Sequence, residues 1–293
     1  FFDKTLFTGG FVGVDVFFVI SGYLISNIIF SELLQNKNFN FANFYERRAR
    51  RILPMLFVVL LISCPIAFYI FLPNDFHEYI DSVISSIFFF SNFFFYSVTT
   101  EYGAESSLLK PLLHTWSLAI EEQFYLFFPI IVFLLFKFHQ NLIIKILILL
   151  FVVSFFFSNI YCNFNPELNF FHPLSRFWEL LTGSLLAYLN LKVKIDKEFY
   201  LSNILTLIGI SLILFSIFLF NDSTPYPNYK TLMPVVGSAL IIFFSSKNNY
   251  ISKLLSSGIF VGIGLISYSV YLWHFPIFAF YRTLKPTINN FDK

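Results

Sequence analysis

The sequence predicts an all-α fold, a polytopic transmembrane helix bundle of about eight spans plus one re-entrant or interfacial segment. Hydrophobic residues make up 57% and charged residues 12% of the 293 residues, and the mean hydropathy is +0.73. A soluble domain carries about 25% charged residues, so this chain lies outside that class. The net charge of +2 is too small for binding through phosphate neutralisation, and no nucleic-acid partner is expected. The two cysteines form neither a disulfide framework nor a metal site, and no metal is expected.

Each predicted span is a stretch of roughly 20 apolar residues, the length of helix that crosses a bilayer core. The stretches are 11–30, 53–72, 117–136, 142–160, 174–190, 202–220, 232–246 and 259–280.

A ninth apolar stretch, 79–99, contains Asp81 and several Ser residues, and the positive-inside rule decides whether it crosses. If it does not cross, twelve Lys and Arg residues lie in the cytoplasm and two lie outside; if it crosses, the split is seven to seven. We therefore expect 79–99 to be re-entrant or interfacial, and the first span to run from outside to inside. The cytoplasmic set is Lys37, Arg47, Arg48, Arg50, Arg51, Lys137, Lys145, Lys192, Lys194, Lys197, Lys247 and Lys253, and the outer set is Lys110 and Lys230.

The charged residues within predicted spans are Asp15, Glu121, Glu122, Arg176, Glu179 and, near the start of 142–160, Lys145. Each costs about 2.5–3.5 kcal/mol at mid-membrane, so such residues face the bundle interior, form pairs or take part in chemistry. Asp15 is either a helix cap at the interface or a functional carboxylate. Arg176 and Glu179 are three residues apart and form a structural pair or line a cavity.

Two further segments combine polar and aromatic residues. In 114–126, Ser117, Glu121 and Tyr125 share one helical face. The adjacent carboxylates Glu121 and Glu122 are typical of a proton-transfer or transport site, although a solvated outer rim would have the same composition. In 267–276, Tyr271 and His274 lie three residues apart and belong either to an interfacial aromatic belt or to a cavity lining.

A basic cluster, Arg47, Arg48, Arg50 and Arg51, precedes the span 53–72. One interpretation is a topogenic anchor. The other is a site for a phosphorylated cytoplasmic ligand, because guanidinium groups bind phosphate with two parallel hydrogen bonds.

Together these segments resemble acyltransferase family 3, the multi-span bacterial enzymes that O-acylate cell-surface carbohydrates. The matching stretches, in the family's order, are 9–26, 44–54, 111–129, 176–187 and 266–277. The resemblance implies a single domain over 1–293 in the bacterial inner membrane. It implies transfer of an acyl group, often acetyl, from cytoplasmic acyl-CoA to a hydroxyl of a cell-surface or lipid-linked carbohydrate, such as one in lipopolysaccharide.

The resemblance also implies roles for individual residues. The cluster Arg47, Arg48, Arg50 and Arg51 would bind acyl-CoA, and Asp15, Glu121 and Glu122 would be catalytic. The acceptor side would comprise His114, Trp116, Ser117, Tyr125, Arg176, Glu179, Tyr271 and His274.

The chain departs from the family at its first span, which carries an Arg and the His taken as catalytic base. That span would lie upstream of Phe1, and none of His77, His114, His139, His172 or His274 matches it. The family also continues past the block that ends this chain, so we expect truncation at both ends. Two rivals stay open: a transporter or flippase of a lipid-linked saccharide, and an inactive remnant. The oligomeric state is open as well.

Overall fold

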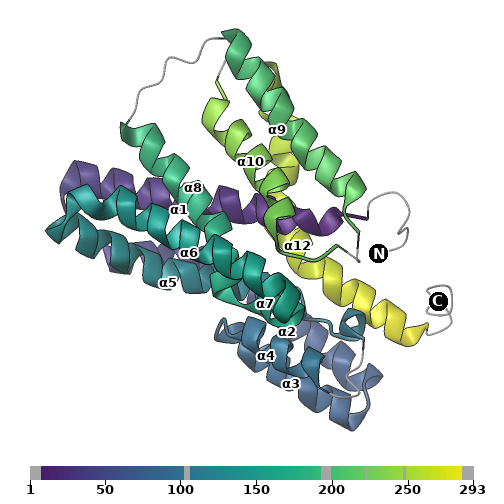
Figure 1. Cartoon of the computed structure of the whole chain (residues 1–293). Coiled ribbons are helices and arrows are strands. Elements are labelled where there is room, and N and C mark those ends of the chain that lie inside the picture. Colours follow the sequence, from purple (N-terminus) through teal and green to yellow (C-terminus); the bar gives the residue numbers. More distant parts are fainter. Residues whose placement is uncertain (1–7, 102–105, 193–198, 222–223, 247–248, 286–293) are drawn as a thin grey trace. The chain divides into compact units, whose positions relative to one another are not determined.

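The computed structural model describes residues 8–101, 106–192, 199–221, 224–246 and 249–285, and these form helices and loops (Figure 1). The expected cytoplasmic residues Lys194, Lys197 and Lys247 lie outside the described residues. The α-helices are α1 (Gly13–Asn36), α2 (Phe41–Ile70), α3 (Pro73–Ile87), α4 (Ser91–Thr100), α5 (Thr115–Phe138), α6 (Ile143–Phe164), α7 (Pro166–Phe171), α8 (Pro173–Lys192), α9 (Phe199–Leu219), α10 (Leu232–Phe244), α11 (Tyr250–Leu255) and α12 (Gly258–Leu284).

The prediction of an all-α membrane protein is confirmed. Six helical segments among the described residues are long and apolar enough to cross a membrane, and they match six of the predicted spans. They are Gly10–Asn36, Phe41–Ile70, Thr115–Phe138, Gln140–Phe164, Phe199–Leu219 and Gly258–Leu284.

The other two predicted spans are helices of a different kind. The segment 174–190 lies in α8, which has 20 residues, enough for about 30 Å, but its buried Arg176 and Glu179 make it more polar than the six. The segment 232–246 corresponds to α10, an apolar helix of only 13 residues, shorter than the roughly 20 that a bilayer core requires.

The ambiguous segment 79–99 does not form one continuous helix. It is divided between α3 and α4, and Phe89 between them has a positive φ of 54°. The backbone N–H of Phe90 donates to the Ser85 carbonyl at 2.8 Å, which closes the turn. A single straight crossing by this segment is therefore excluded, and its re-entrant or interfacial position stays a prediction.

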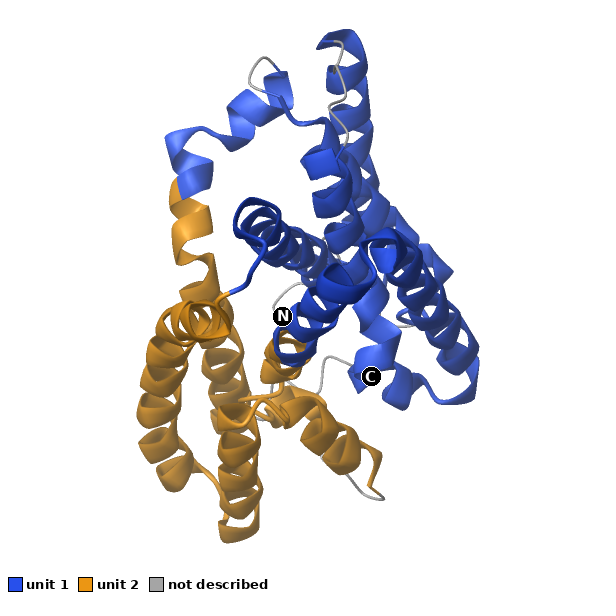
Figure 2. Ribbon diagram, turned by 90° about the vertical axis from the view of Figure 1, so that its left-hand side faces the viewer, with its two compact units in different colours: residues 1–39, 123–261 blue, residues 40–122, 262–293 orange. Residues whose placement is uncertain are grey.

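The described chain divides into two compact units, coloured separately in Figure 2. Unit 1 comprises residues 1–39 and 123–261, and unit 2 comprises residues 40–122 and 262–293. Two of the three boundaries fall inside α5 and α12, and the third lies between α1 and α2. Each unit is therefore discontinuous in sequence and is assembled by contacts between distant segments.

Unit 1 is organised around the contact between α1 and α8. Gly22 and Gly183 allow it, because a Cβ atom at Gly22 would lie 2.0 Å from the Leu180 carbonyl oxygen and one at Gly183 would lie 2.1 Å from that of Val19. The Ser26 hydroxyl donates to that of Ser184 at 2.7 Å further along the same interface. Because residues with increasing numbers on α1 face residues with increasing numbers on α8, the two helices run in the same direction.

Unit 1 also contains two pairs of antiparallel helices, α9 with α10 and α6 with α8. On α9 and α10, a Cβ atom added at Gly209 would lie 2.6 Å from the Gly237 carbonyl oxygen. On α6, the Ser154 hydroxyl accepts the backbone N–H of Trp178 on α8 at 2.8 Å. The Trp178 ring packs edge-on against Phe155 with centroids 5.3 Å apart.

Unit 2 contains α2, α3, α4 and the greater part of α12. The Asn40 side chain accepts the N–H of Asn43 and caps the start of α2. Tyr268 of α12 donates to the Ile52 carbonyl near the start of α2 at 3.0 Å, and Phe280 packs against Phe71 with centroids 5.7 Å apart. These two helices therefore also run in the same direction.

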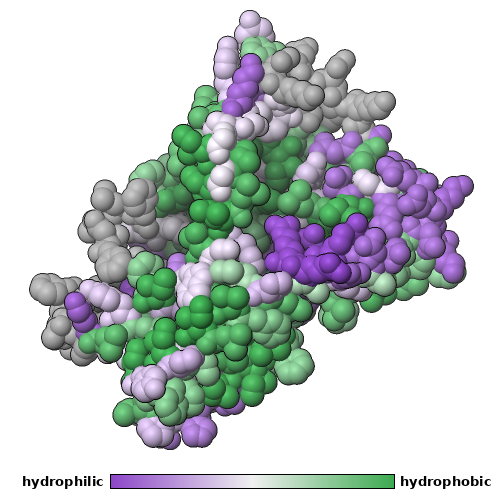
Figure 3. Space-filling model, turned by 180° about the vertical axis from the view of Figure 1, so that it is seen from behind, coloured by the Kyte–Doolittle hydropathy of each residue, from purple (hydrophilic) through white to green (hydrophobic). Residues whose placement is uncertain are grey.

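Apolar side chains cover much of the molecular surface, as the face in Figure 3 shows. On α6, for example, Leu149, Val153 and Phe156 are more than half exposed. Such a surface is the one that a multi-pass membrane protein presents to lipid, where exposed apolar side chains carry no hydration penalty.

The close contact between α1 and α8 at Gly22 can be tested with a matched pair of glycine substitutions. Replacing Gly22 with Ala should push α1 away from α8 and lower the unfolding free energy by about 1–3 kcal/mol. Replacing Gly262 with Ala, where no atom lies within 4 Å of the added Cβ, should leave stability unchanged or raise it by about 1 kcal/mol through helix propensity. Thermal unfolding midpoints in detergent measure both, and equal midpoints would contradict the packing argument.

Candidate functional site

A cluster of buried charged residues lies within unit 1, where α1 and α8 meet. Arg176 on α8 donates through one guanidinium nitrogen to Asp15 Oδ1 on α1 at 3.1 Å and to Glu179 Oε1 at 3.3 Å. All three side chains are at most 1% exposed. The hydroxyl of Tyr226, from the segment between α9 and α10, donates to Asp15 Oδ2.

Aromatic rings and a carbonyl fix the Arg176 guanidinium. It lies 5.1 Å from the Phe170 ring centroid and 4.9 Å from that of Tyr226, a geometry that stabilises cations. Its Nε donates to the Phe170 carbonyl at 3.3 Å. Contacts from α1, α7, α8 and the Tyr226 segment therefore converge on one side chain.

The charges of this cluster require a proton. The carboxyl groups of Asp15 and Glu179 lie within hydrogen-bonding reach of each other. Two ionised carboxylates at that separation would repel each other, and Arg176 balances only one charge. A single proton held by Asp15 and Glu179 makes the cluster neutral, the state that burial favours.

The structure changes the expected grouping of these residues. Arg176 and Glu179 do pair within one helix, and Asp15 joins them from 161 residues away in sequence. Asp15 is fully buried in the first turn of α1, and the alternative of a helix cap at the interface stays a prediction. Tyr226 was not among the predicted site residues, because it lies in an irregular segment where periodicity gives no signal.

Tyr125, also in unit 1, was predicted to share a face of α5 with Ser117 and Glu121. Its hydroxyl hydrogen-bonds to that of Ser21 on α1, and its side chain is buried. Tyr125 therefore links α5 to the helix that carries Asp15.

A second polar cluster lies in unit 2 and joins the start of α5 to α12. The Ser117 and Tyr271 hydroxyls lie 2.5 Å apart, and the Tyr271 hydroxyl also donates to the His114 carbonyl at 2.7 Å. The His114 and His274 rings pack edge-on with centroids 5.5 Å apart. The structure thus brings together four residues that the sequence placed in two separate segments, and Trp116 beside them is also buried.

His114 precedes the first residue of α5 and is held neutral. Burial lowers its pKa to about 3, and the neighbouring His274 ring contributes in the same direction. The Pro111 and Leu272 carbonyls oppose this shift, although neither ring nitrogen makes a hydrogen bond of normal geometry within the described residues. A neutral imidazole offers one donor and one acceptor.

The glutamates and one arginine of the basic cluster also meet in unit 2. The charge of Arg48 interacts with that of Glu122. Glu121 is buried, with 4% of its surface exposed, and both carboxylates interact with Tyr268. The arginines were predicted to bind acyl-CoA and the glutamates to be catalytic, and Arg48 and Glu122 lie close enough for their charges to interact.

The remaining arginines face outward at the start of α2. Arg47, Arg50 and Arg51 are exposed and Arg48 is partly buried. Arg50 forms an ion pair of 2.7 Å with Glu46, one turn earlier. Exposed pairs of this kind contribute little to stability, so an incoming anion can displace Glu46 at small cost.

Comparison with known proteins identifies the family. The profile described as an acyltransferase domain matches residues 1–291. The chain belongs to this acyltransferase family. No solved structure matches the chain.

Two relatives of different length are similar to this chain. An uncharacterized protein of Haemophilus influenzae is 39% identical over 245 residues, which cover 80% of this chain and 99% of the relative. The O-acetyltransferase OatA of Staphylococcus aureus is 34% identical over 287 residues, which cover 93% of this chain and 47% of OatA. The chain therefore spans about half the length of OatA.

The charge balance of the buried cluster predicts how substitution of Arg176 changes stability. Replacing Arg176 with Met should cost about 3–5 kcal/mol of unfolding free energy, because it leaves two carboxyl groups buried without a cation. Adding Asp15→Asn to that variant should restore part of the loss. Thermal unfolding in detergent measures both changes, with Lys145→Met on the exposed face of α6 as control. A midpoint unaffected by Arg176→Met would contradict the proposed charge balance.

The lowered pKa of His114 predicts how the stability of the protein depends on pH. Its pKa is near 6.5 in the unfolded chain and about 3 in the folded one, so below pH 6.5 the unfolded state binds more protons. Its contribution to stability is complete above that pH and falls as the pH drops, by about 1.4 kcal/mol per pH unit.

The measurement compares melting at about pH 7.5 and about pH 5.5. His114→Gln should lose less stability between these values than the unmodified protein. His139→Gln, at an exposed position, should behave like the unmodified protein. Identical pH responses in all three would contradict the assignment.

Proposed function

We propose that this chain is the membrane core of an O-acyltransferase that moves an acyl group, in particular acetyl, from acyl-CoA to a carbohydrate hydroxyl. The acceptor is a cell-surface or lipid-linked saccharide, and the enzyme works in the bacterial inner membrane. Membership of the acyltransferase family and the name of the OatA relatives support the reaction class. The structural observation that carries the proposal is the exposure of Arg47, Arg50 and Arg51 of the basic cluster at the start of α2.

The basic cluster fits the phosphates of acyl-CoA. Arg47, Arg50 and Arg51 are exposed at the start of α2, and guanidinium groups bind phosphate with two parallel hydrogen bonds. Arg48, partly buried behind them, extends the positive charge toward the glutamates. The arginines would hold the nucleotide end of the donor while its acyl end reaches polar groups deeper in the bundle.

The reaction forms one bond and breaks another. The acceptor oxygen attacks the thioester carbonyl, the new C–O bond forms, and the C–S bond breaks. The acceptor hydroxyl loses its proton to a base, and the leaving CoA sulfur takes up a proton. Glu121 and Glu122 are the proposed relay for this proton, because carboxyl groups both accept and donate protons.

Asp15 is proposed to orient and stabilise the catalytic base, the histidine that the family resemblance implies. The Arg176 and Tyr226 contacts fix both of its oxygens. Each carboxylate oxygen accepts more than one hydrogen bond, so Asp15 retains capacity for a further donor. Glu179 and Arg176 would set its charge.

The acceptor site is proposed to include the hydroxyl and imidazole groups of unit 2. Ser117, Tyr271, His114 and His274 form a connected set, and Trp116 lies beside it. Hydroxyl and imidazole groups donate and accept hydrogen bonds, as sugar hydroxyls do, and aromatic rings pack against the apolar faces of sugars.

A transporter or flippase of a lipid-linked saccharide is the second candidate, because buried carboxylates also serve proton-coupled transport. The two functions differ in one observable. An acyltransferase consumes acetyl-CoA only when an acceptor saccharide is present, whereas a transporter moves the saccharide without consuming thioester. An inactive remnant would do neither.

The donor site is tested with the full-length protein in membrane vesicles. Arg48→Gln combined with Arg51→Gln should raise KM for acetyl-CoA by about tenfold or more, the loss expected for charge-assisted hydrogen bonds. Lys253→Gln, which removes an exposed charge from α11, should leave KM unchanged. Release of free thiol measures the rate, and equal KM values in both variants would exclude the donor site.

The role of Asp15 is tested in the same assay. Asp15→Asn should lower kcat at least about a hundredfold, the usual effect of losing acid–base assistance, while membrane insertion and the amount of folded protein are retained. Unchanged acyl transfer by a folded Asp15→Asn protein would remove Asp15 from the mechanism.

A further inference from the structure

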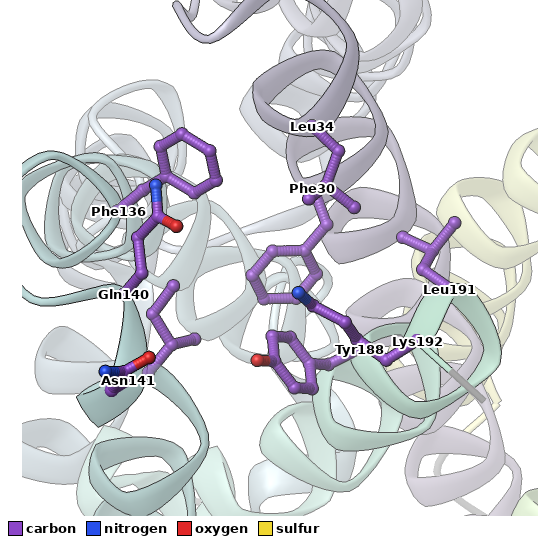
Figure 4. A pocket seen from close by; sticks show the side chains of 9 residues that line it. Phe30, Leu34, Phe136, Gln140, Asn141, Tyr188, Leu191 and Lys192 are labelled. Carbon is purple, nitrogen blue, oxygen red and sulfur yellow. The ribbon is translucent and has the colours of Figure 1, made fainter.

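A cavity of about 250 Å³ lies within unit 1, at the far end of α8 from Arg176 and Glu179 (Figure 4). It is bounded by the last turns of α1, α5 and α8 and by the short 3-10 helix Gln140–Leu142 that precedes α6. It falls just below the usual range of drug-sized pockets, about 300–1,000 Å³, and suits a small polar group. The proposed function makes no use of it.

The cavity has an aromatic side and a polar side. The rings of Phe30 on α1 and Tyr188 on α8 pack edge-on with centroids 5.4 Å apart. The Lys192 ammonium lies 6.0 Å from the Tyr188 ring centroid, and Figure 4 shows its side chain extending from α8 toward the cavity. The amides of Gln140 and Asn141 lie across from Tyr188 and Lys192.

Three observations place the cavity at a membrane–water interface. Three helices that bound it end there, at Asn36, Phe138 and Lys192. Lys37 and Lys137 adjoin these ends, and the positive-inside rule assigns such ends to the cytoplasmic side. Apolar side chains are exposed at its rim, with Leu34 44% and Leu191 38% exposed.

We propose that this cavity binds the headgroup of an anionic phospholipid that carries one phosphodiester, of the phosphatidylglycerol type. Lys192 binds the phosphate, and the Gln140 and Asn141 amides bind the headgroup hydroxyls. The exposed Leu34 and Leu191 contact the first methylenes of the acyl chains, which extend from the cavity into the bilayer.

The charge and the rim favour a lipid over a soluble polyphosphate. Lys192 is the one charged residue among those that line the cavity in the described structure, and it matches a single phosphodiester charge. A nucleotide with several phosphates would leave most of its charge without a partner. A soluble ligand would also leave the leucines at the rim without contacts, whereas acyl chains cover them.

The test is native mass spectrometry of the full-length protein in detergent with phosphatidylglycerol or phosphatidylcholine of the same acyl chains. We expect a retained phosphatidylglycerol adduct and weak retention of phosphatidylcholine. Lys192→Gln should reduce phosphatidylglycerol retention about fivefold, the effect of one lysine near an anionic headgroup. Lys145→Gln removes an equal charge from an exposed position on α6 outside the cavity and should leave retention unchanged.

Two further measurements test the polar side of the cavity and the need for acyl chains. Asn141→Asp places a negative charge opposite Lys192 without changing the side-chain volume, and it should also reduce retention. Glycerol 1-phosphate, the headgroup chemistry without acyl chains, should fail to displace the lipid at equal concentration. Equal retention of both lipids, equal effects of Lys192→Gln and Lys145→Gln, no effect of Asn141→Asp, or displacement by glycerol 1-phosphate would each overturn the proposal.

Discussion

The contact of one guanidinium group with two buried carboxyl groups is the interaction on which unit 1 depends. Arg176 would be costly to bury alone, and so would Asp15 and Glu179. Together, with one shared proton, they form a neutral group that the apolar surroundings tolerate. The arrangement requires α1 and α8 to approach closely, and Gly22 and Gly183 permit that approach. Packing and charge therefore specify the same pair of helices.

Much of the fold could be predicted because membrane spans are long, apolar and local in sequence. The six long apolar helices follow directly from length and hydropathy. The sequence was less informative about α8 and α10. In α8 the buried charges reduce hydropathy, and α10 is ended early by Ser245 and the residues after it. The break at Phe89 was also not predicted, because positive φ at a phenylalanine has no compositional signal.

For the candidate site, the sequence could select the residues but could not predict the contacts between them. The cost of a charge in a membrane was enough to select Asp15, Arg176, Glu179, Glu121 and Glu122 from the sequence. It could not say which of them meet. Asp15 joins Arg176 across most of the chain, and Tyr226 enters from an irregular segment. The pairing of His114 with Tyr271 and His274 likewise depends on packing between distant helices, which no local pattern encodes.

The parallel course of α1 and α8 has a consequence for how unit 1 tolerates change. In this pair, Asp15 lies opposite Arg176, Gly22 opposite Leu180 and Ser26 opposite Ser184, with sequence separations of 161, 158 and 158 residues, so the contacts advance together along both helices. A slip of one turn, about 5.4 Å, would break all three matches together. The close glycine contacts therefore also fix the position of the ion cluster. A shift of α1 along α8 at Gly22 would move Asp15 away from Arg176.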